Sequence, residues 1–408
     1  MSGVDFALDR LPRLRFAAGA LAELPTLAAE FGRRALLVTG AGALERSPHW
    51  QPLCAGLAAA GIDWQHERIA DEPSPALIDA IVARQRGSGI ELVIGIGGGS
   101  ALDAAKAVAG LLPIGEPITA YLEGVGDGRI YRGPALPLIA VPTTAGTGSE
   151  ATKNAVITQR GADGFKKSFR DSRLLPALAL VDPLLLRDCP QRQLAANAMD
   201  ALTQLIEART SLRANPPCNA LAESGLTAAR RGIAALAAAS PETDAEAPIG
   251  AARLADEQLA DLAYAALISG ICLAQVGLGA VHGLASPLGA FFPIPHGVVC
   301  GALLAAATRA NLTALGARAP HNPALAGYAT IGRLLSEDAT LDDASAQAAL
   351  LARIETWTRA LRIPRLGDYA VGESDFPRIV AASRGGSMRS NPLVLGDAEL
   401  RALLAASS

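Results

Sequence analysis

The stretch Leu92-Val-Ile-Gly-Ile-Gly-Gly-Gly-Ser-Ala-Leu-Asp-Ala-Ala-Lys106 decides the fold, because it joins an apolar run to a glycine-rich turn and then to a helical pattern. This order leaves backbone N–H groups free at the positive end of a helix dipole, where phosphate binds readily. Glycine also lets a pyrophosphate approach the backbone without interference from a Cβ atom. The alternative is a tight turn in which Ser100 caps the helix. The spacing is not Gly-x-Gly-x-x-Gly, so the stretch alone does not identify a Rossmann fold.

Short apolar runs alternate with helical patterns on both sides of this stretch, which is typical of a parallel sheet covered by helices. The runs predicted as buried strands are Ala35–Thr39, Leu92–Ile96, Leu138–Val141 and Leu178–Val181. The helical patterns among them are Leu53–Ala60, Pro75–Gln85 and Ala101–Leu111. This half of the chain therefore predicts an α/β domain over residues 1–185.

Beyond Asp182-Pro183, strand patterns almost vanish and long Ala/Leu patterns of helical period continue to the end. Pro, Thr, Asp, Glu and Gly collect in Ala237–Glu257, where we expect a surface loop between two helices. The second half therefore predicts an all-helical domain over residues 186–408.

Composition excludes several classes of protein. The chain of 408 residues is longer than one domain with a single hydrophobic core usually is. Half of its residues are apolar, which excludes a wholly disordered protein. A net charge of −3 offers no general attraction to nucleic acid or to an anionic membrane. Five widely spaced cysteines, none in a Cys-x-x-Cys pair, suit reduced thiols in a cytoplasm.

Leu262–Thr308 contains no Asp, Glu, Lys or Arg, and a run of this length can span a bilayer. Its apolar residues are largely Ala and Gly, and it includes three prolines and two histidines, which favours a tightly packed helical core. The first thirteen residues lack the continuous apolar run of a secretory signal. We therefore expect a cytoplasmic protein with no membrane partner.

A second polar loop, Pro142-Thr-Thr-Ala-Gly-Thr-Gly-Ser-Glu150, follows the predicted strand Leu138–Val141. Its hydroxyls and glycines suit hydrogen bonds to a ribose or a phosphate, although a capping turn would use the same residue types. Two such loops at the carboxyl ends of separate strands favour a dinucleotide crevice.

Asp200, Gln204 and Glu207 are spaced i, i+4 and i+7 in the predicted helix Arg192–Ala208, so they share one face. Two of the five histidines, His282 and His296, lie in the charge-free run. This placement is unusual, because a buried imidazole needs partners for both nitrogens. For either histidine alone, a core histidine bonded to the backbone is the simpler explanation. Together with Asp200 they form an Asp/His/His set that suits Zn²⁺ or Fe²⁺ and leaves a position open for a substrate oxygen.

Four motifs, in order and at family spacing, resemble the iron-containing (group III) alcohol dehydrogenase family: Gly97–Lys106, Pro142–Glu150, Met199–Ala208 and His282–Gly297. The resemblance covers nearly the whole chain and implies a homodimer in which NAD(P) and a divalent metal lie between the two domains. It implies that the cofactor is bound by Gly98, Gly99, Ser100, Asp103, Thr143, Thr144, Thr147 and Lys166. It implies that the metal is bound by Asp200, His282 and His296.

Three positions depart from the family's pattern. Gln204 replaces a histidine that usually supplies a fourth metal ligand, and its neutral amide oxygen would bind Fe²⁺ or Zn²⁺ more weakly than an imidazole. Ser286 replaces a histidine often assigned to proton transfer, so the proton would pass through Ser286, water or a ribose hydroxyl. Gly40 replaces an aspartate that binds the adenosine ribose and repels a 2′-phosphate, so we expect use of NADP as well as NAD.

These features predict reversible hydride transfer between NAD(P)H and a small aldehyde or ketone, with Asp200, His282, His296 and Ser286 as the catalytic residues. A metal-free enzyme similar to maleylacetate reductase is the first alternative. A lyase similar to dehydroquinate synthase is the second, although its anionic substrate calls for clustered cations, and the charge-free run supplies only two histidines. A binding protein without turnover is the third.

Overall fold

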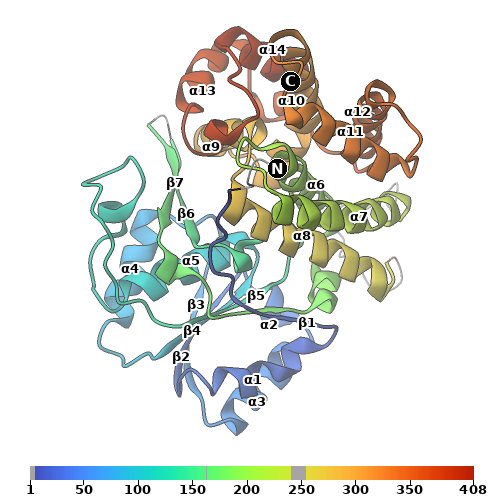
Figure 1. The fold of residues 1–408 in the computed structure, drawn as a ribbon. Coiled ribbons are helices and arrows are strands. Elements are labelled where there is room, and N and C mark those ends of the chain that lie inside the picture. The colour runs from blue at the N-terminus through green and yellow to red at the C-terminus, as the bar shows by residue number, and fades with distance from the viewer. Residues whose placement is uncertain (1–4, 162, 240–253) are drawn as a thin grey trace. The chain divides into compact units, whose positions relative to one another are not determined.

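The computed structural model describes residues 5–161, 163–239 and 254–408, which form two compact units (Figure 1). The α/β unit contains residues 11–189 and 254–263, and the helical unit contains residues 5–10, 190–239 and 264–408. Most of the loop expected at Ala237–Glu257 lies outside the described residues.

A six-stranded parallel sheet in the order β1-β8-β5-β4-β2-β3 forms the centre of the α/β unit. The predicted runs correspond, within one residue at each end, to β2 (Arg34–Thr39), β4 (Leu92–Gly97), β5 (Leu138–Pro142) and β8 (Leu178–Val181). The two edge strands, β1 (Arg13–Phe16) and β3 (Asp63–Arg68), lack an apolar run because much of their length is exposed. The predicted parallel α/β architecture is confirmed.

Both faces of this sheet are buried, which explains why its central strands are apolar at nearly every position. Leu36 and Val38 belong to the core cluster that includes residues of α4 (Pro75–Gln85) and α5 (Gly99–Leu111). Leu37 and Ile94 belong to the opposite cluster, with residues of α1 (Leu24–Ala28) and α3 (Trp50–Ala59). The unit therefore has three layers, helices on either side of one sheet.

The order of strands reverses between β2 and β4, because β3 lies beyond β2 while β5 and β8 lie on the other side of β4. Such a reversal opens a crevice at the carboxyl ends of the two strands, where nucleotides bind in open α/β sheets. The turns after β2 and β4 meet there, since a Cβ atom on Gly97 would lie 3.2 Å from the backbone nitrogen of Gly40. The first glycine-rich loop thus occupies the position that the topology favours for a ligand.

The helical unit has no strand among its described residues. Its helices are α6 (Gln191–Thr210), α7 (Pro216–Ala238), residues 264–276 of α8 (Asp256–Val276), α9 (Ala280–Phe291), α10 (His296–Arg318), α11 (Pro323–Ser336), α12 (Asp343–Ala360), α13 (Phe376–Ala382) and α14 (Asp397–Ser407). Helices α8 and α10 are long and apolar enough to cross a membrane, but most of each apolar window is buried within the protein. They are core helices, as the sequence predicts.

Lys106 is completely buried on α5 and joins that helix to the segment that follows β5. Its ammonium Nζ donates to Ser149 Oγ at 2.6 Å, to Thr152 Oγ1 at 2.9 Å and to the carbonyl oxygen of Asn154 at 2.8 Å. Burial lowers the pKa of Lys106, against the attraction of Asp103, whose Oδ1 lies 3.4 Å away. The lysine therefore holds the two polar loops in one arrangement.

We expect Lys106→Met to lower the free energy of unfolding by about 3–5 kcal/mol, because it removes the cation from a buried, hydrogen-bonded pair and leaves Asp103 uncompensated. Urea unfolding followed by circular dichroism measures the change. The control is Lys167→Met on the hairpin strand β7 (Phe165–Arg170), where the lysine is only partly buried and the expected change is about 0.5 kcal/mol or less. A loss below about 1 kcal/mol in Lys106→Met would show that the lysine does not hold the loops.

Candidate functional site

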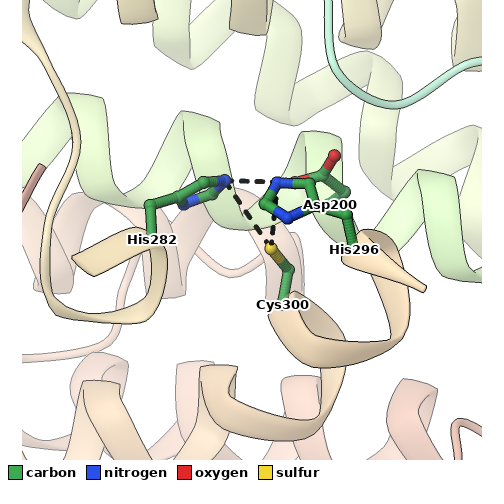
Figure 2. Close-up of side chains that lie close together, drawn as sticks. All are labelled: Asp200, His282, His296 and Cys300. Atoms are coloured by element: carbon green, nitrogen blue, oxygen red, sulfur yellow. Dashed lines mark hydrogen bonds and ion pairs between the residues drawn. The ribbon is translucent and has the colours of Figure 1, made fainter. Parts of the chain in front are cut away.

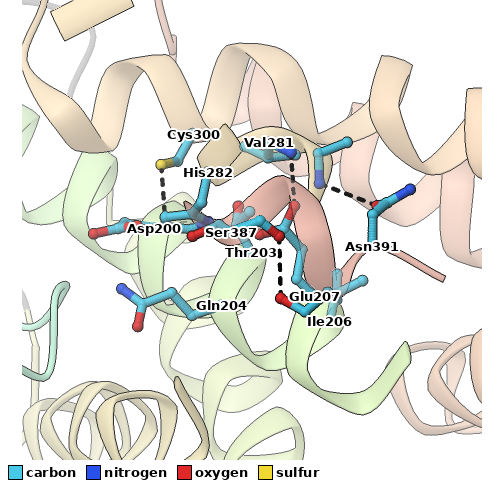
Figure 3. A network of polar contacts seen from close by, with 12 residues as sticks. Asp200, Thr203, Gln204, Ile206, Glu207, Val281, His282, Cys300, Ser387 and Asn391 are labelled. Carbon is cyan, nitrogen blue, oxygen red and sulfur yellow. Dashed lines mark hydrogen bonds and ion pairs between the residues drawn. The ribbon is translucent and has the colours of Figure 1, made fainter. Parts of the chain in front are cut away.

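Helix α6 carries two buried carboxylates that flank one histidine of α9 (Figure 3). Asp200 Oδ1 lies 3.2 Å from Nε2 of His282, and Glu207 Oε2 lies 2.7 Å from Nδ1 of the same ring. The side chains of all three residues are at least nine-tenths buried. The shared face predicted for α6 therefore meets the charge-free part of the chain.

Glu207 also fixes the start of α9. The N-cap of this helix is Gly279, which has no side chain, so its first N–H groups need acceptors from elsewhere. Glu207 Oε1 accepts from Val281 N at 2.7 Å, and Asn391 Oδ1 accepts from Ala280 N at 3.0 Å. A Cβ atom at position 279 would lie 2.9 Å from each of these two oxygens, so the close approach requires glycine.

The carboxylate of Glu207 determines which ring nitrogen of His282 carries a proton. An ionised carboxylate only accepts hydrogen bonds, so the proton lies on Nδ1 and the Nε2 atom presents its lone pair to Asp200 Oδ1. Two acceptors 3.2 Å apart need a positive charge between them, either a second proton or a metal ion. Burial would lower the pKa of His282, but the charges of Cys300 and Glu207 and the hydrogen bond with Asp200 raise it well above its usual value.

Four potential metal donors converge in this region: Asp200, His282, His296 and Cys300 (Figure 2). Asp200 Oδ1 lies 3.8 Å from Nε2 of His296, and Cys300 Sγ lies 3.6 Å from Nε2 of His282 and 3.8 Å from Nε2 of His296. All four donor atoms fall within 4.8 Å of one another. Burial would raise the pKa of Asp200, but His296 and His282 lower it, so the carboxylate is held in its charged form.

Close packing of α10 on α6 brings His296 and Cys300 to Asp200. A Cβ atom on Gly297 would lie 2.6 Å from the carbonyl oxygen of Ala196, and one on Gly301 would lie 3.1 Å from Cβ of Met199. These glycines let the two helices approach more closely than larger residues would. His296 and Cys300, one turn apart on α10, then face the same carboxylate.

The structure brings together three of the four predicted metal ligands, Asp200, His282 and His296, and metal binding by the fourth, Gln204, stays a prediction. Gln204 is buried one turn from Asp200, and its Oε1 accepts a hydrogen bond from Ser269 Oγ at 3.3 Å. Ser286 lies one turn after His282 on α9 and is half-buried. The sequence analysis did not include Cys300, although its spacing of four residues from His296 was a signal that could have found it.

The predicted cofactor loops lie together in the α/β unit. Helix α5 begins at Gly99 with Gly98 as its N-cap, so the alternative in which Ser100 caps the helix is wrong. A Cβ atom on Gly98 would lie 3.2 Å from Cγ2 of Thr144, and one on Gly99 would lie 2.9 Å from Cγ2 of Thr147. The second polar loop, Pro142–Glu150, therefore packs against the N-terminus of α5, as expected if both loops belong to one binding site.

Two of the predicted cofactor residues have protein partners. Asp103 Oδ1 accepts from Ser149 Oγ at 2.6 Å, and its Oδ2 accepts from Val156 N at 3.1 Å. Lys166 pairs with Glu72 at 2.6 Å from the hairpin of β6 (Asn154–Gln159) and β7, which the sequence analysis also did not predict. These bonds position both side chains, and their contact with a cofactor stays a prediction.

Comparisons with known proteins match both units. Residues 12–183 match the family model "iron-containing alcohol dehydrogenase", and residues 194–408 match "Fe-containing alcohol dehydrogenase family, C-terminal". The 1,3-propanediol dehydrogenase of Klebsiella pneumoniae is 30% identical over 383 residues, which cover 91% of this chain and 90% of that protein.

Solved structures are similar over the full chain. A crystal structure of 1,3-propanediol oxidoreductase has a TM-score of 0.85 and 28% identity, and the match covers 100% of both chains. The sulfoacetaldehyde reductase of Bifidobacterium kashiwanohense in complex with NAD⁺ has a TM-score of 0.81 and 25% identity, with 99% of each chain covered.

We expect Glu207→Gln to weaken metal binding by about 10–100-fold, because one amide cannot accept from both Val281 N and His282 Nδ1. Competition between the apo-protein and a chromophoric chelator for Zn²⁺ measures the affinity. Glu223→Gln on α7, which removes a carboxylate paired with Arg209, is the control. Equal affinities in the two variants would show that Glu207 does not orient His282.

Proposed function

The chain belongs to the iron-containing alcohol dehydrogenase family, and on that premise we propose a metal-dependent, NAD(P)-linked enzyme that interconverts a small alcohol and its aldehyde or ketone. The observation that carries the proposal is the convergence of Asp200, His282 and His296 in the helical unit. The names of the similar proteins point to the same substrate class, since they refer to 1,3-propanediol and to sulfoacetaldehyde. The proposal includes a cytoplasmic homodimer, which rests on family membership alone.

The donor set of the helical unit fits a divalent metal such as Fe²⁺ or Zn²⁺. One carboxylate oxygen and two imidazole nitrogens are ligands that both ions accept. Ligands about 2.0–2.2 Å from a common centre in a tetrahedral site lie about 3.3–3.6 Å from one another. The distances from Asp200 Oδ1 to the two Nε2 atoms, 3.2 and 3.8 Å, bracket this range. A metal held there would supply Lewis acidity toward a carbonyl oxygen.

The surrounding residues prepare the site for that chemistry. Glu207 accepts the Nδ1 proton of His282 and so aims the Nε2 atom at the donor cluster. The apolar walls of α9 and α10 provide a low local dielectric, in which charge interactions with a developing alkoxide are stronger than in water. Ser286 is the side chain that we propose for proton transfer, because a hydroxyl can both accept and donate a proton at the substrate oxygen.

The N-terminus of α5 is the proposed site for the pyrophosphate of the cofactor. Gly98, Gly99 and Ser100 lie there, beside the reversal of strand order between β2 and β4. The N-cap offers no side chain to the first N–H groups of the helix, so a phosphate can accept from them. We propose hydroxyl contacts to the cofactor from Thr143, Thr144 and Thr147.

The end of β2 supports use of NADP as well as NAD. A Cβ atom on Gly40 would meet no atom within 4 Å, so the space of the missing carboxylate is open. Arg68 on β3 is paired in register with Thr39, and a guanidinium nitrogen of Arg46 lies 3.0 Å from the Cβ position of Gly42. Arg68 donates to Glu45 at 2.8 Å, which neutralises that carboxylate. Arg68 comes from the neighbouring strand, so the residues that follow Gly40 in sequence do not reveal it.

We expect His282→Ala to remove the bound metal and to lower kcat by a hundredfold or more, since Lewis-acid stabilisation supplies several kcal/mol. Elemental analysis of the purified protein and NAD(P)H oxidation with a panel of aldehydes measure the two effects. His321→Ala, at an exposed histidine of the same unit, is the control.

The same experiment separates the alternatives. Turnover retained in metal-free His282→Ala would support a mechanism similar to that of maleylacetate reductase. Product formed without net oxidation of NAD(P)H would indicate a lyase, and no turnover with any aldehyde, cofactor or added metal would indicate a binding protein.

We expect Gly40→Asp to lower kcat/KM for NADP by about tenfold or more relative to NAD, because a carboxylate at this position would repel the 2′-phosphate. Initial rates with both cofactors give the ratio, and Gly40→Ala controls for the added Cβ atom. An unchanged ratio, or a strong preference of the unmodified enzyme for NAD, would contradict the proposed role of Gly40.

A further inference from the structure

We propose that Cys300 is a fourth ligand of the metal and that its sulfur makes this centre select zinc over iron. The inference rests on the proposed function, in which Asp200, His282 and His296 hold a metal, and adds a residue that determines which metal they hold. It concerns a side chain of α10 that is fully buried and lies one turn after His296.

Four of the six distances between the donor atoms are close to those of a tetrahedral site, and the other two are no longer than 4.8 Å. A sulfur about 2.3 Å and a nitrogen about 2.0–2.1 Å from the same zinc ion lie about 3.6 Å apart. The Sγ atom of Cys300 is 3.6 Å from one Nε2 atom and 3.8 Å from the other. Asp200 Oδ1 approaches the same two nitrogens, so the carboxylate and the sulfur face one pair of imidazoles from two directions (Figure 2).

An ordinary thiol hydrogen bond explains this arrangement less well. A thiol has one proton, which it can donate either to the carboxylate of Asp200 or to one of the two nitrogens at nearly equal distances from Sγ, but not to all three. Glu207 binds the Nδ1 proton of His282, so the nitrogen that faces Cys300 and Asp200 carries either a second proton or a metal ion. A cation among the four atoms satisfies the carboxylate, the sulfur and both nitrogens at once.

The fourth donor changes the chemical character of the site. Two histidines and one carboxylate with open positions are the facial triad typical of non-haem Fe²⁺. A thiolate added to imidazole and carboxylate ligands at tetrahedral spacing is instead typical of Zn²⁺. Cys300 loses its proton to solvent when it binds the metal. A substrate oxygen would then enter as a fifth ligand, an expansion that catalytic zinc sites permit.

Packing keeps Cys300 at the cluster whether or not a metal is bound. Gly297 and Gly301 hold the backbone of this turn of α10 against α6, so the Cα atom of Cys300 stays close to Asp200 as long as the two core helices stay packed. A position fixed in this way is already organised for binding, which reduces the entropy lost when the ligand closes on a metal.

Cobalt reports the ligand directly, because a thiolate bound to Co²⁺ produces an intense near-ultraviolet charge-transfer band that oxygen and nitrogen ligands do not produce. Apo-protein prepared with a chelator is titrated with Co²⁺, and the bound metal is counted by elemental analysis. We expect one Co²⁺ with the band in the unmodified protein, and one Co²⁺ without it in Cys300→Ser. Cys272→Ser, at a buried cysteine of α8 whose sulfur donates to the carbonyl oxygen of Cys218, should keep the band.

Zinc and iron affinities test the selectivity. Loss of a residue that only hydrogen-bonds to a metal ligand lowers metal affinity by about 10–100-fold. Loss of a ligand itself should cost more, so we expect Cys300→Ser to lower the affinity for Zn²⁺ by more than about a hundredfold. The affinity for Fe²⁺, measured anaerobically, should change by less than about tenfold, since iron gains less from a soft ligand. Equal losses for the two metals would overturn the selectivity that we assign to Cys300.

The outcomes distinguish this inference from the proposed function. One bound Co²⁺ without the band in the unmodified protein overturns the role of Cys300 and leaves the Asp/His/His centre standing. A band that persists in Cys300→Ser overturns it as well. No bound Co²⁺ in the unmodified protein overturns both proposals.

A second measurement needs no variant, in case Cys300→Ser does not fold. X-ray absorption at the zinc edge of the zinc-loaded protein should show one sulfur at about 2.3 Å among nitrogen and oxygen neighbours at about 2.0–2.2 Å. A spectrum fitted by nitrogen and oxygen alone would overturn the assignment.

Discussion

The helical unit depends on one constraint, a buried imidazole held between two carboxylates. Asp200 and Glu207 flank His282 at 3.2 and 2.7 Å in a part of the protein with almost no access to water. Two negative charges in such a place are costly unless a cation lies between them. The glycine at the start of α9 lets Glu207 approach that helix, and the close contact of α10 with α6 brings His296 to the same carboxylate as His282, that of Asp200.

In the α/β unit, a carboxylate is also balanced by a cation, but there the cation is a side chain of the protein. Lys106 brings a positive charge to the half-buried carboxylate of Asp103 and hydrogen-bonds to the segment that follows β5. Here the cation is part of the chain, and the result is a rigid pair of loops beside the reversal of strand order. In the helical unit the balancing charge is a proton or a metal ion, which can be exchanged. This contrast suits a scaffold for the cofactor in one unit and chemistry in the other.

The sequence predicted what periodicity and apolar runs encode. It predicted four central strands because they are buried on both faces, and it placed Asp200 and Glu207 on one face of α6 because helical spacing determines that. The edge strands β1 and β3 and the β6–β7 hairpin were not predicted, because their many polar residues interrupt the apolar runs that mark the central strands. Cys300 was not predicted as a metal donor for a different reason. Only the packing of α10 against α6 shows that a residue one turn after His296 also lies close to Asp200. The cation beside Gly40 likewise required the pairing of β2 with β3.

Gln204 and Cys300 occupy equivalent positions on two facing helices. Gln204 follows Asp200 by four residues on α6, and Cys300 follows His296 by four residues on α10. Each lies one turn after a residue of the proposed metal centre. The sulfur of Cys300 lies among the other donor atoms, whereas Gln204 Oε1 accepts a hydrogen bond from Ser269 Oγ. A metal site requires a donor atom at each corner of its coordination polyhedron, and that atom can come from either helix. In the centre that we propose, the thiol on the facing helix takes the place of the imidazole that the family usually has at position 204, and it changes the preferred metal.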